Sequence, residues 1–175
     1  MRLFTVLVFI SVFVPVQIFS EQSFCMSDDQ IISELTDEDE NRLEEQRKII
    51  KQYLDENSLE KFKTPAGKLG TLRALLKAKV FSAEQIYELQ SMGAVLGDVF
   101  VQDIGFHWVM VEDEHGRDPA IRFEDTSIIA FPLTMISKRI ERGEEVDVFD
   151  LYNGIAEMLL DLIKNEKSDI INKKP

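Results

Sequence analysis

The residue that most constrains the fold is Gly105, where the apolar pattern changes from helical to strand spacing. Before it, from Ile86 to Ile104, apolar residues recur every three or four positions, which is typical of a helix packed on one side. After it, residues 106–111 form a run rich in aromatic and β-branched side chains, which is typical of a strand. This change predicts an α+β domain.

A turn signal follows the strand. The sequence Asp113-Glu114-His115-Gly116 predicts a type I turn with Gly116 in the left-handed conformation, which would pair residues 106–112 with 117–123 as a hairpin. A third strand is expected at 127–131. Alternation places apolar side chains on both faces of the first strand, so we expect helices on at least one face of the sheet.

Helices are predicted from cap signals that precede apolar stripes. Thr36, Thr64 and Ser82 each provide an N-cap hydroxyl, Pro132 opens a fourth helix, and Asp147 caps a fifth. The expected helices span 37–56, 65–76, 83–104, 132–142 and 148–164. The predicted architecture is therefore three N-terminal helices, a three-stranded antiparallel meander and two C-terminal helices.

The N-terminus has the layout of a signal peptide. A charged start at Arg2 is followed by an apolar stretch over 3–14, Pro15 and a small Ser20. We expect a signal peptide at 1–20, a flexible lead at 21–35, one domain at 36–165 and a polar tail at 166–175. This predicts a periplasmic or secreted protein with no stable membrane span after signal removal. Because Cys25 is the single cysteine, an intrachain disulfide is impossible.

The charge balance limits the class of partner. The chain has 20 Lys and Arg residues against 32 Asp and Glu residues, a formal charge of −12, and no basic cluster suited to phosphates, so nucleic acid is not expected as a partner. The acidic surface favours solubility and can steer a cationic partner. A small basic patch at Lys138, Arg139 and Arg142 is expected to pair with neighbouring glutamates.

Two glycines inside the predicted helix 83–104 mark a close approach. Gly93 and Gly97 lie four residues apart on one face, and each weakens the helix by about 1 kcal/mol. We expect packing against a strand or another helix to compensate. The alternative is a ligand groove over these glycines, beside Trp108.

Polar side chains concentrate at the hairpin. Asp113, His115, Arg117 and Asp118 fall within one turn, which is typical of a solvated tip, although an acid–base pair or a metal site has the same composition. No catalytic, metal-binding or cofactor-binding residue is predicted. The candidate binding surface comprises Gly93, Gly97, Asp98, Trp108, Asp113, His115, Arg117 and Asp118.

Four blocks carry a resemblance to a known family. They are Gly93–Asp98, Trp108 with Glu112–Ala120, Phe131–Leu133 and Ile136–Glu144. In this order they resemble the bacterial family called domain of unknown function 3806, over roughly residues 64–160. The resemblance implies a bacterial origin and one compact domain, and it implies no role for any residue.

These observations favour a non-catalytic binding or interaction module whose partner is an unknown protein or small ligand. The alternative is a hydrolase-like enzyme that uses His115 or His107 with Asp113, Asp118 or Asp98.

Overall fold

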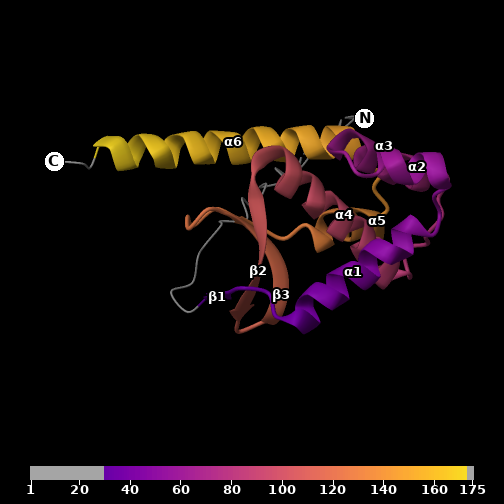
Figure 1. Cartoon of the computed structure of the whole chain (residues 1–175), viewed down its shortest axis with the longest axis horizontal. Coiled ribbons are helices and arrows are strands. Elements are labelled where there is room, and N and C mark those ends of the chain that lie inside the picture. The colour runs from indigo at the N-terminus through magenta and orange to yellow at the C-terminus, as the bar shows by residue number, and fades with distance from the viewer. Residues whose placement is uncertain (1–29, 173–175) are drawn as a thin grey trace, which may run out of the picture.

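The computed structural model describes residues 30–172 and confirms an α+β fold (Figure 1). Six helices and four strands occur in this part of the chain. In order they are β1 Ile31–Ser33, α1 Asp37–Lys51, α2 Glu56–Lys61, α3 Pro65–Lys77, α4 Ile86–Ile104, β2 Phe106–Asp113, β3 Gly116–Phe123, β4 Ile129–Ala130, α5 Leu133–Glu141 and α6 Val148–Asn172. The predicted order of helices, meander and helices is confirmed, whereas the counts differ.

The four strands form one antiparallel sheet in the order β1-β2-β3-β4. The hairpin register is as predicted, because Glu112 pairs with Arg117 and Phe106 with Phe123. Gly116 has a φ of +136°, a conformation that favours glycine, so its role as the positive-φ residue of the turn is also confirmed.

Helix α4 is the centre of the helical layer. Helices α1, α3 and α5 pack against it, and it also contacts β2 and α6. Its buried residues include Leu89, Val95, Leu96 and Phe100, because one broad face of this helix is apolar. The Tyr152 hydroxyl donates a hydrogen bond to Asp103 and so ties α6 to α4.

The predicted first helix is wrong at its C-terminal end. The single helix expected at 37–56 ends at Lys51, and Asn57 and Ser58, expected to terminate it, lie inside α2. Helix α2 starts afresh because the Asp55 side chain accepts a hydrogen bond from Ser58 N at 2.7 Å.

The predicted start of the central helix is also wrong. Helix α4 begins at Ile86 with Gln85 as an N-cap that makes no side-chain capping bond. Only one of the two hydrogen bonds of the expected capping box forms. Gln85 Oε1 accepts from Ser82 N at 3.0 Å, and this bond closes a turn that precedes the helix. The C-terminal end is as predicted, with Gly105 left-handed at φ +91°.

Two segments that were expected to lie outside the domain form regular elements. Residues 31–33, assigned to the flexible lead, form β1 and pair with Met110–Glu112 of β2. Residues 166–172, assigned to the polar tail, continue α6. The proposed signal segment and Cys25 lie outside the described residues. Among the described helices, none has the length and apolarity needed to cross a bilayer.

Candidate functional site

The site is built around Trp108, whose indole ring lies against α4 at Gly97. A Cβ atom at Gly97 would lie 2.4 Å from Cζ2 of this ring, so the ring occupies the space that a side chain would fill. At Gly93 a Cβ would lie 2.5 Å from Cα of Leu133, the first residue of α5. Both glycines therefore serve close packing, as predicted, with a strand side chain at one and a helix backbone at the other.

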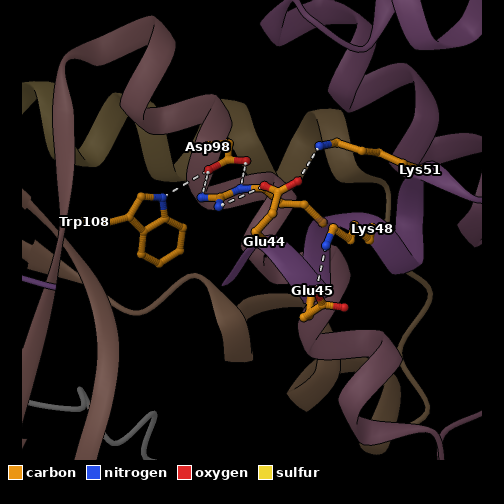
Figure 2. Close-up of polar contacts among 7 residues, drawn as sticks. Glu44, Glu45, Lys48, Lys51, Asp98 and Trp108 are labelled. Atoms are coloured by element: carbon orange, nitrogen blue, oxygen red, sulfur yellow. Dashed lines mark hydrogen bonds and ion pairs between the residues drawn. The ribbon is translucent and has the colours of Figure 1, made fainter. Parts of the chain in front are cut away.

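Asp98 fixes the orientation of the Trp108 ring. The indole Nε1 donates to Asp98 Oδ1 at 3.1 Å, and Arg47 on α1 donates to the same carboxylate from Nε at 2.7 Å and from Nη2 at 2.8 Å (Figure 2). A two-point guanidinium–carboxylate contact is among the stronger polar interactions in proteins. The carboxylate thus joins α1, α4 and β2.

The Arg47–Asp98 pair is largely shielded from water, with side-chain exposures of 20% and 14%. Burial by itself lowers the pKa of Arg47, but the hydrogen bond and negative charge of Asp98 raise it above its ordinary value. The guanidinium therefore stays charged, and its charge is compensated locally by Asp98.

Glu44 borders this network on the next turn of α1. It accepts a hydrogen bond from Lys51 Nζ at 2.9 Å, and its second oxygen lies 3.6 Å from Arg47 Nη1. The hydrogen bond from Lys51 is the main cause of a lowered pKa at Glu44, which is therefore ionised at neutral pH. The Lys48–Glu45 pair in Figure 2 is well exposed, with side-chain exposures of 59% and 63%.

A hollow of about 550 Å³ opens beside this network. We call it the Trp108 hollow. It is lined by Leu35, Glu40, Asn41, Leu43, Glu44, Arg47 and Trp108. An aromatic ring and two carboxylates in one open hollow can hold a cationic group by cation–π and ionic contacts.

The hairpin candidates are not part of this hollow. Arg117 donates to both oxygens of Asp39, each at 2.6 Å, and so ties β3 to the start of α1. The His115 side chain is 82% exposed, and its backbone N–H donates to Asp113 Oδ1 at 2.8 Å. The contacts of Asp113 and His115 are those of a solvated turn, as expected, whereas Arg117 forms a long-range ion pair with the buried Asp39 that was not predicted.

The acid–base pairs of the hydrolase alternative are not formed. Across the described residues, neither His107 nor His115 makes a side-chain hydrogen bond to Asp98, Asp113 or Asp118. Residues 30–172 as a whole contain no group of three or more His, Cys, Asp or Glu side chains placed to hold a metal ion.

Sequence reasoning found Gly97, Asp98 and Trp108 but missed Arg47 and Glu44. Arg47 lies between Leu43 and Ile50, the two buried apolar residues of α1, and this place beside the packed face was the available signal. Its partner on α4, 51 residues away, has no counterpart in local sequence patterns.

Comparison with known proteins agrees with this description of the fold. A family model described as "Domain of unknown function (DUF3806)" matches residues 68–152. The resemblance to this family is confirmed. The match includes Asp98 and Trp108 but not α1, so Arg47, Glu44 and Glu40 lie outside the part that resembles the family. No curated protein matches the chain.

A solved crystal structure of a protein from Bacteroides thetaiotaomicron VPI-5482 is similar in fold, with a TM-score of 0.59 and 11% sequence identity. The similarity covers 74% of this chain and 48% of that one, so this chain corresponds to about half of the solved protein. At this identity the likeness concerns the fold alone.

Proposed function

We propose that this chain is a non-catalytic binding module, exported to the bacterial envelope, that holds a cationic group of its partner in the Trp108 hollow. The observation that carries the proposal is the placement of Glu40 and Glu44 around a tryptophan ring fixed by Asp98 and Arg47. Tryptophan is the aromatic side chain that attracts cations most strongly.

The charge of the site favours a cation over an anion. Glu40 is exposed and forms no ion pair with another described residue, so its charge is free to meet a ligand, whereas Glu44 is ionised but already paired with Lys51. Arg47 is the cation in the hollow lining, and Asp98 already neutralises it. The chain as a whole carries −12, which would further attract a cationic partner.

The Trp108 ring is pre-organised for binding. It rests on Gly97, and its indole N–H is held by Asp98, so little rotational freedom remains to be lost when a ligand binds. A lysine or arginine side chain of a protein partner has the charge and length to enter such an open hollow.

Trp108 is the single tryptophan of the chain, so its fluorescence reports this hollow directly. We expect tetralysine to change the emission of the purified protein at low salt, and the change to weaken at high salt because ionic contacts are screened. Tetraglutamate is the control of opposite charge. The absence of any change in emission with tetralysine at low salt would contradict the proposal.

A matched pair of variants tests the place of binding. Glu40→Gln should weaken tetralysine binding severalfold, whereas Glu157→Gln on the exposed face of α6 removes the same charge without touching the hollow. Equal losses in the two variants would show that only net charge matters. Envelope extracts passed over the immobilised wild type and Glu40→Gln would then identify the partner that depends on the hollow.

The proposed export rests on the apolar segment at 3–14 with Pro15 and Ser20 behind it. Mass measurement of the protein recovered from bacterial cells should show a mature chain that lacks about the first 20 residues. Recovery of the uncleaved chain from the cytoplasm would contradict this part of the proposal.

A further inference from the structure

A second hollow of about 260 Å³ lies among α1, α4, β3 and α5. Its charged lining residues are Arg42 on α1, Lys138 on α5 and Asp118 on β3. Its apolar lining residues are Pro119, Phe131 and Leu133. We call it the Arg42 hollow.

The Arg42 hollow is separate from the Trp108 hollow. Arg42 lies two residues from both Glu40 and Glu44, and residues two apart on an α-helix point about 160° away from each other. The two hollows therefore lie along opposite sides of α1.

The three charged groups of the Arg42 hollow have no ionic partner of their own. Within the part of the chain that the structure describes, neither Arg42, Lys138 nor Asp118 has an opposite charge within 4.0 Å, and none makes a side-chain hydrogen bond. Their neighbours differ in this respect. Arg117 binds Asp39 and Arg142 binds Glu144 at 2.6 Å, so the expected local pairing of the basic patch holds for Arg142 but not for Lys138.

We propose that the Arg42 hollow binds a small zwitterion, namely a free α-amino acid. The ligand carboxylate lies at Arg42 and Lys138, and its ammonium group lies at Asp118. A metal cation would be repelled by the two basic side chains, and a simple anion would leave Asp118 uncompensated. A ligand that carries both charges satisfies all three groups.

The size and the apolar part of the hollow restrict the ligand further. Pockets for drug-sized ligands have volumes of about 300–1,000 Å³, so a hollow just below this range suits a smaller molecule. Pro119, Phe131 and Leu133 offer an apolar surface to the ligand side chain. The class that fits is an amino acid with an aliphatic side chain.

Calorimetric titration of the full chain with L-leucine tests the proposal. N-acetyl-L-leucine lacks the ammonium charge and L-leucinamide lacks the carboxylate, so each should bind at least tenfold more weakly than leucine. Failure of leucine to bind at millimolar concentration would overturn the proposal. Equal binding of N-acetyl-L-leucine would overturn it as well, because the hollow would then be a plain anion site.

Variants assign the two ends of the ligand. Lys138→Gln should weaken leucine binding severalfold, and Lys77→Gln on the exposed face of α3 should leave it unchanged. Asp118→Asn should weaken leucine binding and leave the weak binding of N-acetyl-L-leucine unaltered. The substituted residues Lys77, Asp118 and Lys138 are all exposed, so the variants should fold. Circular dichroism is the check that they do. An equal loss from Lys77→Gln and Lys138→Gln would overturn the assignment.

Discussion

Gly97 and Trp108 are in contact so close that one methyl group cannot be added between them. A Cβ at position 97 would lie 2.4 Å from Cζ2 and 2.5 Å from Cη2 of the indole ring. Gly97 on α4 thus determines how close the Trp108 ring can lie to this helix.

Gly97→Ala should therefore destabilise the protein. Overpacking costs about 1–3 kcal/mol, which exceeds the gain of about 1 kcal/mol in helix propensity. Gly154→Ala is the matched control. Gly154 is helical and a Cβ there meets no atom of residues 30–172 within 4 Å, so this variant should be more stable than wild type. Urea unfolding followed by circular dichroism measures both. Equal effects of the two substitutions would contradict the packing role.

Asp98→Asn should loosen the Trp108 ring and leave the more distant Glu44, at 3.6 Å, as the ionic partner of Arg47. Hydrogen bonds to charged groups contribute about 1.5–3 kcal/mol, and the partial exposure of this pair places the expected loss at the lower end of that range. Glu45→Gln removes an exposed contact to Lys48 and should change stability by less than about 1 kcal/mol. Trp108 emission should shift in Asp98→Asn and not in Glu45→Gln. An unshifted emission in Asp98→Asn would mean that another contact holds the ring.

Gln46→Met should stabilise the protein. Gln46 is fully buried on α1, and neither the nitrogen nor the oxygen of its amide has a hydrogen-bond partner among the described residues. An unsatisfied buried polar group costs about 1–3 kcal/mol, and methionine has a similar length without that polarity. Thermal unfolding of this variant should show a higher Tm, while the exposed Gln52→Met should leave the Tm nearly unchanged. A lower Tm for Gln46→Met would show that the amide has a role in the fold.

Stability should fall at acid pH through Asp39. The hydrogen bond from Arg117 is the main cause of a pKa for Asp39 well below its usual range. Because the folded-state pKa is the lower one, the stabilisation is present above the ordinary aspartate pKa of about 3.9 and is lost as the pH falls toward the folded-state value. Urea unfolding between pH 6 and pH 2 should therefore show falling stability.

Arg117→Gln isolates this contribution. The variant should be less stable than wild type at neutral pH, and the difference between the two should narrow as the pH falls below about 4. Lys63→Gln, which breaks an exposed pair with Glu60, should run parallel to wild type over the whole range. If the difference in stability between Arg117→Gln and wild type does not change with pH, the loss of stability at acid pH does not come from the Arg117–Asp39 pair.

The parts of the fold that local sequence determines were predictable. Gly105 and Gly116 mark a helix end and a turn because few other residues adopt their φ angles, and Thr64 and Asp147 cap the helices that follow them. Strand β1 was missed because three residues carry too little periodicity, and it exists only through pairing with β2. The Gln85–Ser82 contact was misread as a helix cap because the same side-chain bond also forms in a turn.

The site was only partly predictable for a related reason. Asp98 and Trp108 lie ten residues apart on adjoining elements and could be linked by reasoning about one helix and one strand. Arg47 and Arg42 reach their hollows only because α1 packs on α4, a tertiary arrangement that no spacing along the chain specifies.

The outer sides of the two long strands are only partly paired. Strand β1 pairs with Met110–Glu112 of β2, and β4 pairs with Ile121 and Arg122 of β3, so most of each eight-residue strand has no strand partner on that side among the described residues. An unpaired strand edge can extend a ladder of hydrogen bonds into a neighbouring molecule, and charged residues and proline oppose this. The part of β3 that β4 leaves uncovered contains Arg117, Asp118 and Pro119, so the association of two copies of this protein through β3 should be weak even in concentrated solution.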